Sequence, residues 1–295
     1  MSILFKTLNN DIKDDVERRH THEPPGEYSH KARRLTTLTN AGLLSPSAGR
    51  IRLGFVGLAA GVGATTLCFA AAEYFSSLIK KSATRIVTML EIDLRTDAPA
   101  GRPFDKIGID RRFAGRDFIP LYRLAAEGKP LHGVLNIDGG INWALRIPDE
   151  HGPVPTPATL HRLISNAAGD IILCDISAQG ILGGEGAYKD RDALLAILSD
   201  LDHIICIFDP LPSRLLAAVP AAEVCRAAAA AGVPVTWVFN KLNAGVNLRE
   251  VTRFTGVKDY LAFPAVSAEN VYAAEYACRS LAPELEKPLS ALFQN

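Results

Sequence analysis

The stretch Gly54-Phe-Val-Gly-Leu-Ala-Ala-Gly-Val-Gly-Ala-Thr-Thr-Leu67 decides the fold of this chain. The apolar run over residues 51–56 predicts a buried strand, and an apolar helix is expected to begin at Ala64. A glycine-rich turn separates the two. Such a unit forms a phosphate cradle, because successive backbone N–H groups and the helix dipole point at one anion. The stretch therefore predicts an α/β fold that carries a phosphate site.

Residues 59–66 read Ala-Ala-Gly-Val-Gly-Ala-Thr-Thr. This stretch resembles the loop K-G-G-x-G-K-T-T of the ParA/MinD family of deviant P-loop ATPases, in the SIMIBI class. The resemblance implies a three-layer P-loop NTPase fold over residues 51–295, with a mostly parallel central sheet and helices on both faces. Alanine stands at Ala59 and Ala64, where that family has two lysines. In the family the second lysine holds the outer phosphates and the first reaches the partner's nucleotide in a dimer, and a methyl group does neither.

The resemblance also implies a cofactor, ATP or ADP with Mg²⁺. The glycine turn and the first helical turn would bind its phosphates through Gly61, Val62, Gly63, Ala64, Thr65 and Thr66. The hydroxyl of Thr65 would in addition be a ligand of the metal. The alternative, since both lysines are missing, is a strand-to-helix turn that binds no cofactor.

Two acidic strand ends complete the resemblance. Residues 85–90 predict a second buried strand, followed by Glu91-Ile-Asp93 where the family has D-x-D. In that register Asp93 would position the attacking water and is the catalytic candidate. A register shifted by two residues pairs Asp93 with Arg95 instead, and a plain turn-capping carboxylate is a further interpretation. Asp175 follows four apolar residues, as in the Walker B pattern, and would hold Mg²⁺ through water.

The apolar stretch 233–239 predicts another buried strand, which ends in Asn240-Lys241. Family members place an asparagine there to contact the adenine base, so Asn240 is the candidate base-binding residue. A strand-end cap is the other interpretation. The stretch 260–266 resembles the family's last strand and the proline loop that borders the base.

Composition limits the partners. Lys plus Arg and Asp plus Glu number 32 each, so the formal net charge is zero and we expect no nucleic-acid partner. Five cysteines in apolar contexts, without C-x-x-C spacing, indicate buried thiols in a reducing compartment. The sequence shows neither a signal-peptide core nor the ~20 apolar residues of a membrane span. We therefore expect a cytoplasmic protein with no direct membrane span.

Three segments carry weaker patterns. Residues 1–50 predict a partly ordered N-terminal arm with a short docking helix over residues 1–19. The alternative is a partner-binding or membrane-surface helix, and the mixed charge of its polar face argues against lipid. The basic and aromatic run within residues 99–130 predicts an exposed, salt-bridged connection, or a surface that binds an anion or an acidic partner. The tail 271–295 predicts a helix interrupted by Pro283 and Pro288, without the basic face of a membrane helix.

Hydrolysis depends on positive charge at the γ-phosphate. Together with the resemblance, the two alanines predict a non-catalytic or very weak ATPase. It would localise or scaffold a cell-envelope machine for cellulose or exopolysaccharide secretion or for pilus assembly, as BcsQ-like and CpaE/TadZ-like proteins do. Expected partners are a protein at the inner membrane that recruits the chain there, a paralogous ATPase, or a second copy in a homodimer. The alternatives are a slow ATP-dependent switch with Mg²⁺ and a compensating basic residue, and a DNA or plasmid segregation ATPase.

Overall fold

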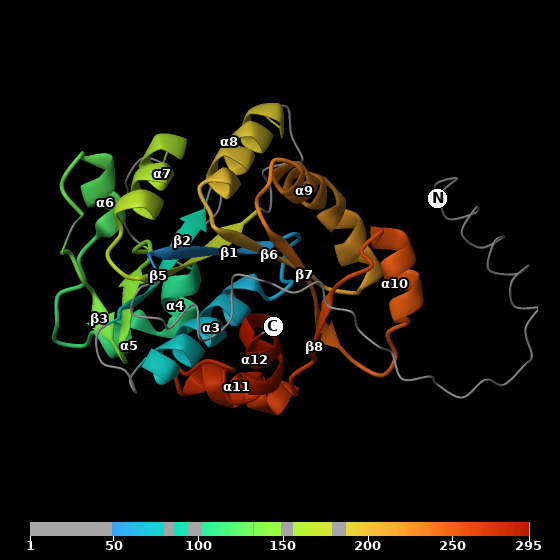
Figure 1. Cartoon of the computed structure of the whole chain (residues 1–295). Helices are drawn as coiled ribbons and strands as arrows, with labels where there is room; N and C mark the ends of the chain where they lie inside the picture. Colours follow the sequence, from blue (N-terminus) through green and yellow to red (C-terminus); the bar gives the residue numbers. More distant parts are fainter. Residues whose placement is uncertain are drawn as a thin grey trace, which may run out of the picture. The chain divides into compact units, whose positions relative to one another are not determined.

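The computed structural model describes residues 49–79, 85–93, 102–131, 133–148, 156–178 and 187–294, all within one compact unit of residues 32–295. The predicted N-terminal helix of residues 1–19 lies outside these ranges. Eight strands form one sheet (Figure 1), in the spatial order β3 (Ile137–Asp138), β4 (Ile141–Ala144), β2 (Val87–Asp93), β5 (Ile171–Ser177), β1 (Ile51–Gly57), β6 (His203–Phe208), β7 (Val235–Leu242) and β8 (Leu261–Pro264). Neighbouring strands are parallel except in the pair of β3 with β4. The mostly parallel sheet predicted from the sequence is confirmed.

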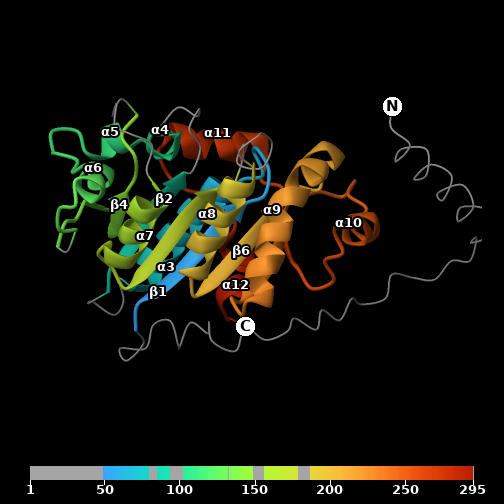
Figure 2. The ribbon, with the colours of Figure 1, turned by 90° about the horizontal axis from the view of Figure 1, so that it is seen from above.

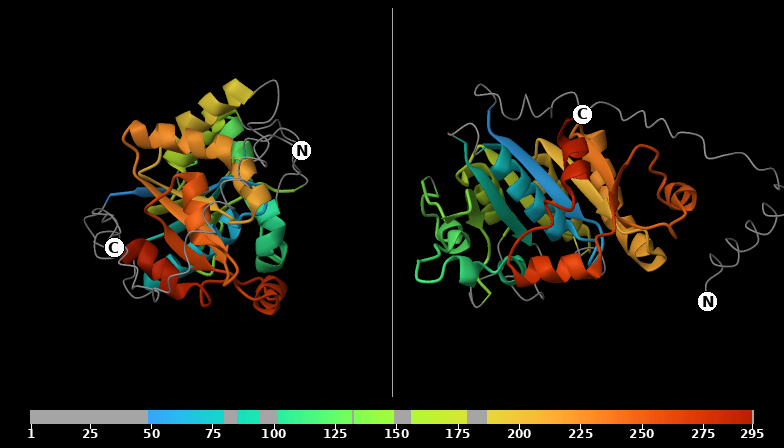
Figure 3. Two further views of the ribbon diagram at one scale, coloured as in Figure 1. Left: turned by 90° about the vertical axis from the view of Figure 1, so that its right-hand side faces the viewer. Right: turned by 90° about the horizontal axis from the view of Figure 1, so that it is seen from below.

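Helices cover both faces of the sheet (Figures 1 and 2). On one face lie α7 (Pro157–Asn166), α8 (Ala187–Ser199) and α9 (Pro212–Ala230), and on the other lie α3 (Ala64–Ile79), α11 (Ala268–Tyr276) and α12 (Glu286–Gln294). Figure 3 shows the same layers from two further sides. The shorter helices are α4 (Arg102–Ile107), α5 (Ile109–Arg112), α6 (Leu121–Ala126) and α10 (Leu248–Thr255). The three layers agree with the predicted architecture.

Strand β1 lies at the centre of the sheet, between β5 and β6. Its residues Leu53, Phe55 and Val56 are fully buried, as expected for a parallel strand with helices on both sides. Helix α3 follows directly and packs on β1, β2 and β5 through small residues such as Ala70, Ala71 and Ala72 on its buried side. The motif that decides the fold is therefore also the middle of the core.

Local sequence signals explain the ends of several elements. Gly139 and Gly140 have φ of 62° and 85° between β3 and β4. They form the turn of a hairpin, because a two-residue turn of this kind favours positive φ at both positions. Helix α7 begins after Thr156, whose hydroxyl accepts from Thr159 N at 3.2 Å. The prediction that Pro288 interrupts a helix is wrong. Pro288 lies in the first turn of α12, where a residue needs no N–H donor.

The basic run within residues 99–130 is salt-bridged as predicted, and Arg111 and Arg116 are exposed, but Arg112 departs from the prediction. The side chain of Arg112 is only 15% exposed and pairs with Asp138 at 3.1 Å and with Glu73 at 3.4 Å. Its guanidinium carbon lies 5.5 Å from the ring centre of Phe69 and 5.3 Å from that of Trp143. Aromatic faces attract a guanidinium group, so this arginine is part of the packing between α5, α3 and β4.

All five cysteines are free thiols and four of them are buried, as the sequence predicts, whereas Cys278 is only partly buried. Among the helices that the structure describes, none combines the length and the apolar character needed to cross a membrane.

Candidate functional site

Residues 58–63, the glycine loop, join β1 to α3. Gly61 has φ 67° and Gly63 has φ 94°, a region of backbone conformation that residues with a Cβ rarely adopt. A Cβ on Gly63 would lie only 2.6 Å from Asn240 Nδ2. The loop thus follows a tight path that glycine permits, and its backbone can approach a ligand closely.

The first turn of α3 faces the same space. Leu67 N donates to Gly63 O at 3.0 Å, while the amides of Ala64, Thr65 and Thr66 belong to the first turn, where an α-helix provides no acceptor for them. These amides and the positive end of the helix dipole favour an anion. The backbone cradle predicted from the sequence is therefore present without any lysine in the loop.

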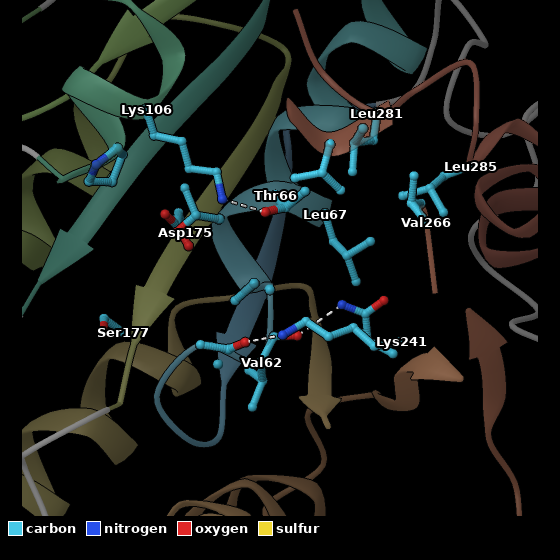
Figure 4. Close-up of a pocket in the computed structure, with 18 of the residues that line it drawn as sticks. Val62, Thr66, Leu67, Lys106, Asp175, Ser177, Lys241, Val266, Leu281 and Leu285 are labelled. Carbon is cyan, nitrogen blue, oxygen red and sulfur yellow. Dashed lines mark hydrogen bonds between the residues drawn. The ribbon is translucent and has the colours of Figure 1, made fainter. Parts of the chain in front are cut away.

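A cavity of about 500 Å³ opens at the glycine loop and the carboxyl ends of the neighbouring strands (Figure 4). Small-molecule pockets typically measure about 300–1,000 Å³, so a nucleotide is a suitable occupant by size. The wall contains every residue that the sequence predicts to bind the cofactor: Gly61, Val62, Gly63, Ala64, Thr65, Thr66 and Asn240.

Two buried carboxylates, Asp175 on β5 and Glu91 on β2, lie opposite each other in the sheet register and both line the cavity. Glu91 accepts a hydrogen bond from Arg146 N at 2.9 Å. Within the described ranges, no three His, Cys, Asp or Glu side chains are grouped closely enough to bind a metal on their own. A Mg²⁺ ion at Thr65 and Asp175 would thus need water and phosphate oxygens as its other ligands, which is its usual coordination beside a nucleotide. The metal role of these two residues stays a prediction.

Asp93 is the last residue of β2 and pairs with Ser177 of β5. The strand continues through Glu91 and Ile92 instead of ending at Leu90, because Ile92 is fully buried and extends the apolar core. The side chain of Asp93 and the whole of Arg95 lie outside the described residues. The catalytic role of Asp93 therefore stays a prediction.

Cys68 lies in α3, one turn beyond Thr65 and close enough to Asp175 to sense its charge. Burial, with the negative charge of Asp175 added, raises the pKa of the Cys68 thiol well above its ordinary value. The thiol is neutral near pH 7 and packs as a small apolar group, so we assign it no chemical role.

Asn240 is buried at the end of β7, and its side chain donates from Nδ2 to Val62 O at 2.9 Å. The strand-end position predicted from the sequence is correct. The donor group is used to hold the glycine loop, which the sequence did not indicate. Asn240 still lines the cavity, and contact with a base stays a prediction.

Lys241 is a site residue that sequence reasoning did not assign. It has φ 58° and lies at an irregularity in the pairing of β7 with β8. Its ammonium group donates to Gly61 O and to Asp209 Oδ2, the latter at 3.1 Å. Asp209 is only 3% exposed. A left-handed residue at a bulge redirects its side chain, and here Lys241 is directed at the glycine loop.

Lys106 of α4 is the second unassigned residue. Its Nζ donates to Thr66 Oγ1 at 2.7 Å and lies 3.6 Å from Glu275 Oε1 of α11. Figure 4 shows its chain extending to Thr66 on the side of the cavity where Asp175 lies, while Lys241 approaches from the other side. The sequence carried no signal for this contact, since the two residues are 40 positions apart.

One apolar side of the cavity wall comes from the C-terminal part of the chain. This C-terminal part of the wall consists of Pro264, Ala265, Val266, Val271, Leu281 and Leu285. The first three belong to the proline loop that the sequence analysis placed beside a base, and their position at the cavity is as predicted. The leucines after α11 were not predicted. An apolar wall opposite a phosphate cradle suits a planar aromatic ring.

No family model and no curated protein sequence matches this chain. A ParA family ATPase structure from Chlorobium tepidum TLS aligns with a TM-score of 0.57 and 17% identity, over 83% of this chain and 97% of that chain. The septum site-determining protein MinD from Pyrococcus horikoshii OT3, complexed with Mg-ADP, aligns with a TM-score of 0.57 and 17% identity, over 83% of this chain and 92% of that chain. The MinC:MinD cell division complex from Aquifex aeolicus aligns with a TM-score of 0.57 and 12% identity, over 83% of this chain and 92% of that chain. The fold is that of the ParA and MinD ATPases.

Two observations test whether the site at the glycine loop suits a nucleotide. The glycine loop turns through two left-handed glycines, and the cavity beside it has a polar end at the first turn of α3 and an apolar end at residues 264–266. A phosphate chain suits the first end and a base the second. The residues present therefore fit a nucleotide, and Ala64 stands where the sequence resemblance places the family's phosphate-binding lysine.

Proposed function

We propose that this chain binds an adenine nucleotide with Mg²⁺ at the glycine loop, hydrolyses it very slowly or not at all, and acts through nucleotide-dependent contacts with a protein partner. The observation that carries the proposal is the cavity of about 500 Å³ where the glycine loop, the first turn of α3 and Asp175 meet.

Different parts of the cavity would bind different parts of the nucleotide. Backbone amides of residues 61–66 would hold the phosphates. The Thr65 hydroxyl and Asp175, through water, would hold Mg²⁺, which neutralises phosphate charge when bound. Asn240 and the apolar residues 264–266 would border the base. Each of these residues lines the same cavity.

The alanines at Ala59 and Ala64 are the reason for slow or absent turnover. Positive charge at the transferred phosphate stabilises the transition state, and one such cationic group is typically worth about 10³–10⁵ in rate. Asp93 would position water in the remaining reaction. A slow ATP-dependent switch is the second candidate, and it is favoured by Lys106, a cation outside the glycine loop that lines the cavity.

An exposed apolar surface supports the contact role. Leu211, Leu216 and Val219, at the start of α9, are exposed large apolar side chains. Arg214 of the same helix would lie 3.6 Å from a Cβ on Gly61, so the start of α9 adjoins the glycine loop. A ligand on the loop can thus alter what the surface contacts.

The proposed occupant of this surface is a second copy of the chain or a paralogous ATPase, with a protein at the inner membrane as the recruiting partner of an otherwise cytoplasmic protein. The role in a secretion or pilus machine rests on the sequence resemblance alone. Light scattering with and without ATP measures whether two copies of the chain associate. A nucleotide-dependent rise in mass that Leu216→Asp abolishes would support the homodimer.

Binding and turnover are tested by titrating the purified chain with a fluorescent ATP analogue and Mg²⁺ while phosphate release is followed. We expect saturable binding with phosphate release close to the protein-free blank. Gly63→Ala should lose binding, and Gly232→Ala, at a left-handed glycine with open space around it, should keep it. Absence of binding at millimolar nucleotide would overturn the proposal, and turnover of about 1 s⁻¹ or more, as in ordinary enzymes, would overturn its non-catalytic part.

A further inference from the structure

We propose that Lys106 of α4 supplies the phosphate-binding charge that the glycine loop lacks. The inference rests on the proposed nucleotide binding and identifies the residue that would make it selective for phosphates. The Lys106 ammonium group would reach the phosphates from α4, which lies outside the glycine loop, at the first turn of α3.

The position of the Lys106 ammonium group is the first argument. It donates to Thr66 Oγ1 at 2.7 Å, and Thr66 lies in the helical turn whose amides point at the cavity. An anion at those amides would therefore meet the Lys106 charge as well. Ala64, where the resemblance places the missing lysine, lies in the same turn and lines the same cavity.

The weak hold on Lys106 is the second argument. Thr66 offers a neutral hydroxyl, and the ion pair with Glu275 is 3.6 Å long between side chains that are 36% and 53% exposed. Exposed ion pairs of this kind contribute little. A phosphate oxygen, which forms a shorter charge-assisted hydrogen bond, can replace either contact.

Lys241 is the other cation among the described residues that line the cavity, and it is committed elsewhere. Its ammonium group pairs at 3.1 Å with Asp209, a buried carboxylate, and donates to the carbonyl oxygen of Gly61. A phosphate that took this lysine would leave a buried carboxylate without its counter-charge, which is costly. Lys241 therefore braces the loop, and Lys106 is the residue available to the phosphates.

The test measures the affinities for ATP, ADP and adenosine by competition with a fluorescent ATP analogue. The variants are Lys106→Ala, Lys106→Arg, and Lys129→Ala as a matched control, because Lys129 is also exposed and paired with a glutamate but lies outside the cavity. Thermal unfolding of each variant verifies that it is folded. We expect Lys106→Ala to weaken ATP binding about tenfold or more and to leave adenosine binding unchanged. Lys106→Arg and Lys129→Ala should stay within about threefold of wild type.

A second variant moves the charge back into the loop. Ala64→Lys in the Lys106→Ala background is expected to recover ATP affinity, because the new ammonium group enters the same cavity. Wild-type affinity for ATP in folded Lys106→Ala would overturn the inference while leaving nucleotide binding intact, and so would an equal loss of ATP and adenosine. A wild-type chain that binds neither ligand would overturn the proposed function itself, and the inference with it.

Discussion

Lys241 Nζ lies 3.1 Å from Asp209 Oδ2 and also donates to Gly61 O, so one side chain at the end of β7 holds both the end of β6 and the glycine loop. Asp209 also accepts from Leu211 N at 3.1 Å, at the start of α9. The charge pair thus connects the loop to the exposed apolar surface of α9. It is half open to solvent, because the Lys241 side chain is 45% exposed.

Removing this connection should destabilise the fold moderately. We expect Lys241→Ala to lower the free energy of unfolding by about 1–3 kcal/mol, because a buried carboxylate loses a charged donor. Denaturant unfolding measures the effect, and Lys258→Ala, at an exposed lysine, should change it by less than about 0.5 kcal/mol. In a double-mutant cycle with Asp209→Asn the coupling should exceed about 0.5 kcal/mol. Additive single effects would show that the pair does not stabilise the protein.

Gly63→Ala should lower the free energy of unfolding by more than the backbone strain of a left-handed alanine alone. At Gly232, with φ 101° and open space around it, alanine adds backbone strain only, about 1–2 kcal/mol. At Gly63 the new Cβ would also lie 2.6 Å from Asn240 Nδ2, and overpacking adds about 1–3 kcal/mol. Urea unfolding of the two variants measures the difference. Equal losses would mean that Asn240 does not pack against the loop as described.

Substitution of Arg112 should destabilise the protein more than substitution of an exposed arginine. Its ion pairs with Glu73 and Asp138 and its position between Phe69 and Trp143 are lost together in Arg112→Ala. We expect a loss of about 3 kcal/mol in unfolding free energy, with less than half recovered by Arg112→Lys, since lysine cannot form the planar fork.

The control for Arg112 is Arg123→Ala, which removes an exposed pair with Glu127 one helical turn away. That change should cost about 0.3–0.5 kcal/mol. Similar losses at the two arginines would contradict the role of Arg112 in the packing.

His203 should make the protein sensitive to acid. The side chain is 1% exposed at the start of β6, and burial lowers its pKa to about 4, against 6.5 for an ordinary histidine. Between those values the unfolded chain binds one proton more than the folded protein, so the free energy of unfolding falls as pH decreases. The full effect is about 3 kcal/mol from pH 6.5 to pH 4.

The contribution of His203 is isolated by comparing wild type with His203→Gln, which retains a group able to reach Thr236. The stability curve of the variant should fall less steeply between pH 6.5 and pH 4. Parallel curves would mean that His203 is protonated in the folded protein.

The parts of the site that the sequence predicted are local. The glycine loop, the beginning of α3 and the carboxylate of Asp175 each follow from a short run of residues whose conformation is set by glycines, apolar periodicity and a strand end. Parallel strands then bring these ends to one edge of the sheet. This is why the predicted cofactor-binding residues line one cavity.

The parts that the sequence did not predict depend on long-range packing. Lys241 reaches the loop because a single left-handed residue at a bulge changes the direction of its side chain. Lys106 reaches Thr66 because α4 packs near the start of α3, and Arg112 is mostly shielded from solvent because two aromatic rings from distant segments lie against it. Nothing in the residues next to these three charges distinguishes them from solvated ones.

The most direct test of the account is a crystal structure of the chain grown with a non-hydrolysable ATP analogue and Mg²⁺. The account predicts the phosphates against the amides of residues 61–66, with the Lys106 ammonium group about 3 Å from a phosphate oxygen. An analogue missing from the glycine loop at saturating concentration, or one bound there while Lys106 remains on Thr66 and Glu275, would contradict it.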